Sequence, residues 1–158
     1  MKREPARCLI LACGNTLRGD DGIGPFLAAW AEQRFESEAE VQVVARQQWT
    51  PELAEEVSRA ESVLFIDCSI ELAAGAIAVA PVIPAAAEQG LATHHLGAAE
   101  LLALAKEFYD SLPRIALQLT IGAGSLELSE ELSPAVTVSL PEARRLLEET
   151  VVRLLTIP

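Results

Sequence analysis

Apolar and polar residues alternate along the chain in blocks that have the lengths of strands and helices. Short apolar runs predict five β-strands, at residues 9–13, 41–45, 62–66, 75–82 and 115–121. Apolar residues at helical spacing predict four helices, at residues 21–35, from residue 51, at residues 96–106 and from residue 140. The first strand is apolar on both faces, so we expect it to lie inside the sheet.

Residues that favour helix starts precede two of the predicted helices. Thr50 is expected to cap the second helix, with Pro51 at the first helical position, where a missing N–H does no harm. Ser139 and Glu142 have the spacing of a capping box, which predicts that the last helix begins at residues 140–141.

The order of these elements indicates an α/β fold. Strands that alternate with helices form mostly parallel sheets with helices on both faces. Residues 75–82 follow the preceding strand without a helix between them, so this strand is expected to pair antiparallel or to lie at a sheet edge. The chain shows no internal repeat and no linker, and we therefore expect residues 1–158 to form a single domain.

The chain is acidic, with 23 acidic and 12 basic residues and a formal net charge of −11. This charge disfavours nucleic acid and anionic membranes, which are also negative, although a soluble acidic protein of any function would share it. No apolar run approaches the roughly 20 residues of a membrane span. Three cysteines without a CxxC pair, and the lack of an export signal, predict a cytoplasmic protein.

Polar residues that follow the apolar segments are the candidates for chemistry. Asp20 and Asp21 come after the first strand, Asp67 ends the third, and His94 and His95 follow a loop of small residues. If the first and third strands are neighbours, Asp21 and Asp67 emerge at one edge of the sheet, where open α/β sheets place their ligands. Two close carboxylates favour a cation, and an added imidazole gives a ligand set for a divalent transition metal with open coordination positions.

Structural roles explain the same residues individually. An aspartate at a helix start is usually an N-cap, which applies to Asp20 or Asp21, and Asp67 can cap a turn. Adjacent histidines at a helix start can be solvated surface residues. The sequence contains no GxSxG, HExxH or GxxxxGK[ST] motif, which argues against serine hydrolases, thermolysin-like zinc sites and phosphate-binding loops.

Four segments then identify a likeness to a known family. They are GNTLRGDDGIG at residues 14–24, VLFIDCSI at 63–70, THHLGAAELL at 93–102 and GSLELSEELSPAVTVSLPEARRLL at 124–147. In this order the segments resemble the GNxLxxDDGxG, Asp, HxLG and LSPxVxxxxPxA landmarks of the nickel–iron hydrogenase maturation endopeptidases. The resemblance covers roughly residues 7–155.

The resemblance implies a three-layer α/β/α fold around a twisted five-stranded sheet. It also implies an endopeptidase that removes a C-terminal peptide from the nickel-loaded hydrogenase large-subunit precursor. Asp21, Asp67 and His94 match the family's two carboxylates and histidine, so they are expected to recognise nickel and to serve as the catalytic set. The nickel is expected to arrive with the substrate, with other divalent ions as alternatives. Asp20 is expected to act as a turn residue, a cap or a support for the metal ligands.

The chain departs from the family after the second strand. Gln47, Gln48 and Trp49 stand where better-known members have a glycine-rich GGT-type turn, and that region is thought to shape the substrate cleft. Trp49 is expected either to contact a peptide or to pack over the second helix. The alternatives to the endopeptidase are a non-catalytic metal-sensing or chaperone protein on the same fold, and a peptidase with a non-hydrogenase substrate.

Overall fold

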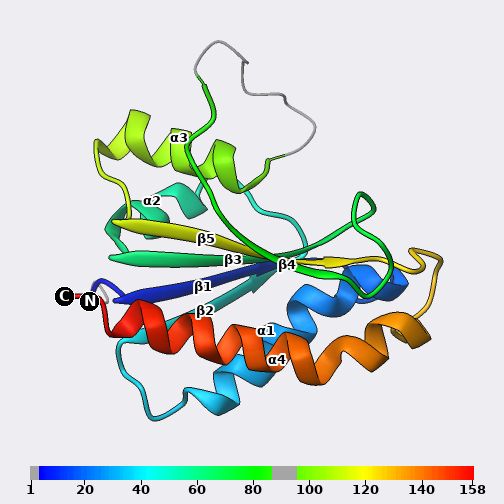
Figure 1. Ribbon diagram of the computed structural model, residues 1–158. Helices are drawn as coiled ribbons and strands as arrows, with labels where there is room; N and C mark the ends of the chain where they lie inside the picture. Colours follow the sequence, from blue (N-terminus) through cyan, green and yellow to red (C-terminus); the bar gives the residue numbers. More distant parts are fainter. Residues whose placement is uncertain (1–3, 87–95) are drawn as a thin grey trace.

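The computed structural model describes residues 4–86 and 96–158. Its centre is a five-stranded sheet in the order β2-β1-β3-β5-β4, covered by helices on both faces (Figure 1). The elements are β1 (Cys8–Cys13), the 3₁₀ turn η1 (Gly19–Gly22), α1 (Ile23–Arg34), β2 (Val41–Arg46), α2 (Leu53–Arg59), β3 (Ser62–Ser69), β4 (Ile77–Pro81), α3 (Ala98–Tyr109), β5 (Ile115–Gly122) and α4 (Pro134–Leu155). The predicted α/β sandwich is therefore confirmed.

Strands β2, β1, β3 and β5 are parallel, and only β4 runs antiparallel, paired with β5 at one edge of the sheet. The strand predicted at residues 75–82 is thus both antiparallel and at the edge. Parallel strands connected by helices are buried on both faces, which explains why β1 and β3 read as continuous apolar runs.

Two apolar cores lie on the two faces of the sheet because successive strand residues point to opposite sides. Ile10 and Leu64 pack toward α1 and α4, whereas Leu11 and Phe65 pack toward α2 and α3. Figure 1 shows α2 and α3 together on one face of the sheet and α1 and α4 on the other. Among the described residues, no helix is long and apolar enough to cross a membrane.

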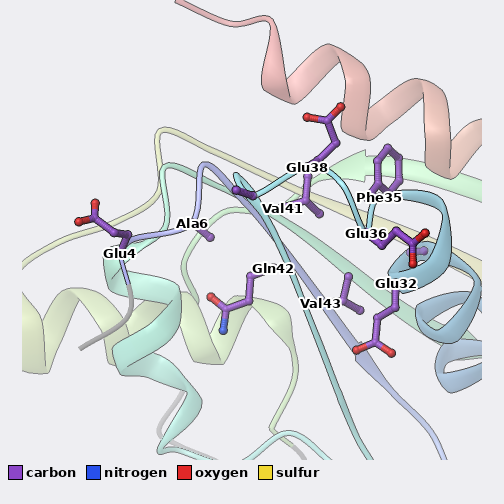
Figure 2. Close-up of a pocket in the computed structure, with 11 residues that line it drawn as sticks. Glu4, Ala6, Glu32, Phe35, Glu36, Glu38, Val41, Gln42 and Val43 are labelled. Carbon is purple, nitrogen blue, oxygen red and sulfur yellow. The ribbon is translucent and has the colours of Figure 1, made fainter. Parts of the chain in front are cut away.

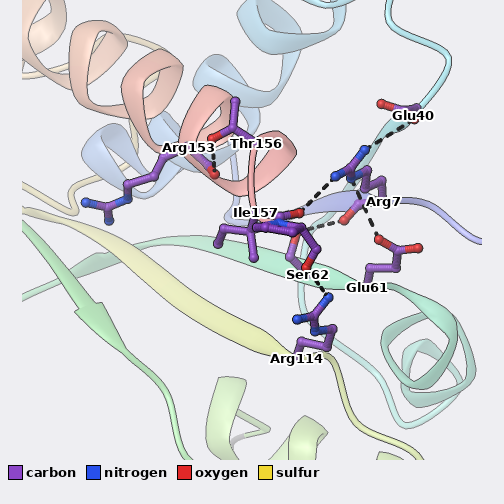
Figure 3. A network of polar contacts seen from close by, with 9 residues as sticks. Arg7, Glu40, Glu61, Ser62, Arg114, Arg153, Thr156 and Ile157 are labelled. Carbon is purple, nitrogen blue, oxygen red and sulfur yellow. Dashed lines mark hydrogen bonds and ion pairs between the residues drawn. The ribbon is translucent and has the colours of Figure 1, made fainter.

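Polar contacts fasten the end of the chain to the amino-terminal end of the sheet (Figure 3). The Arg7 guanidinium donates to the Ile157 carbonyl at 2.8 Å, and Arg114 donates to the Pro158 carbonyl at 2.6 Å. Arg7 also lies 3.8 Å from carboxylate oxygens of Glu40 and Glu61. These pairs are partly exposed, so the hydrogen bonds to the chain end matter more than the ion pairs.

The predicted start of the last helix is wrong. Helix α4 begins at Pro134, and its N-cap is Ser133, whose side chain accepts from the Val136 N–H. Ser139 lies inside the helix and donates to the Val136 carbonyl instead of forming a capping box. Pro141 is therefore an interior residue of α4. The Ser133–Pro134 pair is itself a helix-start signal, and it prevails over the later one.

The second helix also begins later than predicted. Helix α2 starts at Leu53, and Thr50 and Pro51 form a preceding turn in which the Thr50 carbonyl accepts from the Leu53 N–H at 3.1 Å. The Thr50 side chain hydrogen-bonds to Glu52 and helps to lower the pKa of that carboxyl. Thr50 therefore orders the turn but does not cap the helix.

Replacing Pro141 by Ala is expected to stabilise the protein. An interior proline removes one backbone hydrogen bond and opposes helix geometry by about 3 kcal/mol relative to alanine, partly offset by its rigidity in the unfolded chain. We expect P141A to raise the free energy of unfolding by about 1–2 kcal/mol, measured by urea denaturation. The control is P134A at the first helical position, which should give no gain; equal effects of both substitutions would contradict the assigned helix start.

Candidate functional site

A cavity of about 300 Å³ opens at the carboxyl ends of the parallel strands. Open α/β sheets place their ligands at this edge. The residues that line the cavity come from the ends of β1 and β3, from the turn after β1, from the segment after β2 and from the start of α3: Cys13, Gly14, Asn15, Arg18, Asp21, Gln47, Gln48, Trp49, Asp67, Cys68, Leu96 and Gly97.

Close backbone packing places Asp21 beside the end of β1. A Cβ atom on Gly14, which has φ of +154°, would lie 1.9 Å from the Asp21 carbonyl oxygen, and one on Gly24 would lie 2.2 Å from the Cys13 carbonyl oxygen. Only glycine fits such contacts. The Asn15 N–H donates to the Asp21 carboxylate at 2.7 Å and fixes its direction. The glycines of this motif therefore bring strand and helix together rather than bind phosphate.

Asp67 lies within β3, which continues to Ser69 instead of ending at the aspartate as predicted. Its register partner on β5 is Thr120, whose hydroxyl donates to the Asp67 carboxylate at 3.0 Å. Asp67 is half-buried at the cavity wall. Regular strand geometry, and not a turn, positions this side chain, so the interpretation of Asp67 as a turn cap is wrong.

The structure brings Asp21 and Asp67 to the same cavity, as expected for neighbouring parallel strands. Burial raises the pKa of the Cys13 and Cys68 thiols to about 12, and both carboxylates contribute further to this rise. The two aspartates therefore create a common negative field at the cavity, which a cation would relieve. His94 and His95 lie outside the described residues, and no three ligating side chains are grouped for a metal ion within residues 4–86 and 96–158.

Asp20 has a different role from its neighbour. Its side chain is fully buried, and its carboxylate accepts from the backbone N–H groups of Gly124, Ser125 and Ser133 at 2.7, 2.9 and 2.7 Å. The Ser133 hydroxyl donates to the same carboxylate at 2.7 Å. Burial acts to raise the pKa of Asp20, but these hydrogen bonds outweigh it and hold the pKa below its ordinary value.

Neither aspartate caps a helix. No side chain caps η1 or α1, and Gly22 occupies the N-cap position of α1. The N-cap interpretation of Asp20 and Asp21 is therefore wrong. Sequence reasoning missed the role of Asp20 because its partners come 104 to 113 residues later in the chain.

Of the two expectations for Trp49, packing over the second helix is confirmed, and contact with a peptide stays a prediction. The side chain is 6% exposed and packs in the core with α2, edge-on to the Phe65 ring at a centroid distance of 5.3 Å. It also lines the cavity, next to the exposed side chains of Gln47 and Gln48. The segment after β2 thus forms one wall of the candidate site.

A second hollow, of about 440 Å³, lies near the amino-terminal end of the sheet, between the end of α1 and β2. Figure 2 shows Glu32, Glu36 and Glu38 around it, with Phe35 and Val41 nearby. This hollow lies at the opposite end of the strands from the edge where open α/β sheets place their ligands. The hollow at the carboxyl ends of the strands, which holds Asp21 and Asp67, is therefore the candidate site.

Several solved structures that share this fold are hydrogenase maturation proteins. The chain aligns with the hydrogenase maturating endopeptidase HybD from E. coli at 21% identity and a TM-score of 0.73, over 93% of both chains. It aligns with the maturation protease HybD from Thermococcus kodakarensis at 26% identity and 0.66, over 91% of this chain and 98% of that one. It aligns with the hydrogenase 2 maturation peptidase from Thaumarchaeota archaeon SCGC_AB-539-E09 at 26% identity and a TM-score of 0.62, over 92% of this chain and 97% of that one.

These neighbours confirm the predicted resemblance to the hydrogenase maturation endopeptidases. No protein-family model and no curated protein matches the chain. The likeness therefore rests on shared structure together with the motifs in the sequence.

Replacing Asp20 by Asn is expected to destabilise the protein strongly. The amide would keep one acceptor oxygen and would direct an NH₂ group at donors that now bind the carboxylate. We expect D20N to lower the free energy of unfolding by about 2–4 kcal/mol in urea denaturation at pH 7. D21N should cost much less, because Asp21 is half-exposed and an asparagine oxygen can still accept from the Asn15 N–H.

The pH dependence of the free energy of unfolding distinguishes the hydrogen-bonded Asp20 carboxylate from a side chain that only fills space. Because the pKa of Asp20 is lower in the folded protein, its contribution is fully present above the ordinary carboxyl value of 3.8 and disappears as the pH falls through the folded-state value. The stability difference between wild type and D20N should therefore shrink below about pH 4. A difference that stays constant down to pH 2 would contradict the carboxylate lock.

Proposed function

We propose that this chain is an endopeptidase that removes a C-terminal peptide from a nickel-loaded hydrogenase large-subunit precursor. The observation that supports it is the convergence of Asp21 and Asp67 on one cavity, in the fold of the maturation endopeptidases. His94 completes the set through the HxLG motif, at a position outside the described residues. Two carboxylates and an imidazole suit a divalent transition metal and leave room for the substrate's own ligands.

Nickel is part of the substrate in this proposal. Asp21 and Asp67 attract the ion through their shared negative field, and the hydrogen bonds from Asn15 and Thr120 hold the two carboxylates in place. The ion supplies Lewis acidity toward a carbonyl or a water molecule near the bond to be cut. The aspartates and His94 thereby position the scissile segment, so recognition and cleavage depend on the same residues.

In the cation-free cavity, Cys13 and Cys68 are poor nucleophiles. Cys13 and Cys68 line it, but burial and the neighbouring carboxylates raise the pKa of both thiols to about 12. At neutral pH these thiols are protonated, and the thiolate is the reactive form. Water is therefore the expected nucleophile.

Mass spectrometry of a nickel-loaded large-subunit precursor tests the proposal directly. Wild-type protein should shorten the precursor at its C-terminus, whereas D21N, D67N and H94A should lower the rate by about 100-fold or more, because each removes one proposed metal ligand. The matched control is D110N, an exposed Asp-to-Asn change at the left-handed C-cap of α3, which asparagine tolerates. Stable binding of the precursor without cleavage would favour a metal-sensing or chaperone protein instead.

Dependence on nickel is a separate expectation. If the ion arrives with the substrate, the wild-type protein should cleave the loaded precursor and leave the nickel-free precursor intact. Comparing the two precursors by mass spectrometry, under otherwise identical conditions, measures this dependence. Equal cleavage of both would show that the metal does not license the reaction.

A further inference from the structure

The indole nitrogen of Trp49 is a buried donor that has no acceptor in the described part of the chain. Trp49 is only 6% exposed, and its Nε1 atom has no hydrogen-bond partner within residues 4–86 and 96–158. Buried polar groups are nearly always paired, and an exception calls for an explanation. The indole N–H can only donate, so the missing partner is an acceptor.

The position of Trp49 connects this donor with the candidate site. The ring lines the cavity and packs edge-on against Phe65 in the core. The segment that carries Trp49 leaves β2 at Arg46, whose carbonyl accepts from the Gly14 N–H at 3.1 Å. The tryptophan is thus anchored to the same turn that positions Asp21.

The charge of the cavity decides which acceptor fits. Asp21 and Asp67 outnumber Arg18 among the charged residues that line the cavity, so a carboxylate or phosphate group beside the aspartates is disfavoured. A neutral carbonyl oxygen carries no such penalty, and an extended peptide presents one at every residue. The amide side chains of Gln47 and Gln48, exposed at the rim, both donate and accept, as peptide backbone requires.

We propose that Trp49 is a substrate-anchoring residue whose indole N–H donates to a main-chain carbonyl of the extended C-terminal tail of the protein substrate. The inference rests on the proposed function and specifies how its substrate is held. The Nε1 atom is covered in the empty cavity, so the proposal includes a turn of the indole toward the tail when the tail binds. Trp49 then contributes to substrate affinity and not to the chemical step, because the metal ligands carry the reaction.

The two tryptophans of the chain allow a sharp test. Trp30 lies on α1 and packs against the core on the opposite face of the sheet, so W30F leaves Trp49 as the only indole. Replacing Trp49 in W30F by benzothienylalanine preserves the ring shape and removes only the N–H. W49F removes the N–H together with part of the ring, so it serves as a coarser genetic variant, and thermal denaturation checks that all variants fold.

The probe is a synthetic peptide that spans the cleavage site and the tail of the precursor. We expect the peptide to shift the Trp49 emission of W30F. The benzothienylalanine protein should bind the peptide about 3- to 10-fold more weakly, the size of one neutral hydrogen bond. On the nickel-loaded precursor, KM should rise by the same factor, with kcat within about twofold.

Unchanged peptide affinity and KM in the benzothienylalanine protein would overturn the inference, as would an emission that does not respond to the peptide. Cleavage by W30F in that case would leave the proposed function intact. If no variant cleaves the precursor but the peptide still shifts the emission and binds more weakly without the N–H, the anchoring role stands and the peptidase function fails.

Discussion

The buried carboxylate of Asp20 holds together the parts of the chain that form the candidate site. It accepts hydrogen bonds from three backbone N–H groups and from the hydroxyl of Ser133. These donors belong to the loop after β5 and to the start of α4. Ser133 in turn caps α4 by accepting from Val136. A single charged group therefore links the first turn of the chain to its last helix. Burying this carboxylate without partners would cost much free energy. Its four hydrogen-bond donors offset that cost and fix its orientation.

Asp20 makes the structural hydrogen bonds, and the adjacent Asp21 lies at the cavity instead. Glycines allow the turn after β1 to pack against the start of α1, so two neighbouring aspartates point to different surroundings. One is fully buried among donors, and the other is half-exposed at a cavity. Parallel pairing of β1 with β3 then brings Asp67 to the same cavity. The acid pair in the sequence thus divides into one structural and one candidate functional residue.

These details define what the sequence can predict. Strands were predictable because buried parallel strands are continuous apolar runs, and the convergence of Asp21 and Asp67 followed from the shared edge of neighbouring strands. The start of α4 was harder to predict, because two start signals, at Ser133 and at Ser139, compete within seven residues. The contact of Ser133 with Asp20, which adds to its cap and to Pro134 in favouring the first signal, comes from a distant part of the chain. The role of Asp20 depends on pairings across more than 100 residues, which no local pattern encodes.

Among the described residues, the candidate site has few reactive groups of its own. The thiols in the cavity are held protonated by burial and by the carboxylates, and those carboxylates gain most from a divalent cation. Under the proposed function, a site of this kind would act only when a cation and a peptide arrive together. The indole N–H of Trp49, which has no acceptor among the described residues, would gain one if a peptide carbonyl reached the cavity wall, as we propose. Metal and peptide then each supply what the empty cavity lacks, and this mutual dependence would confine cleavage to a substrate that carries both.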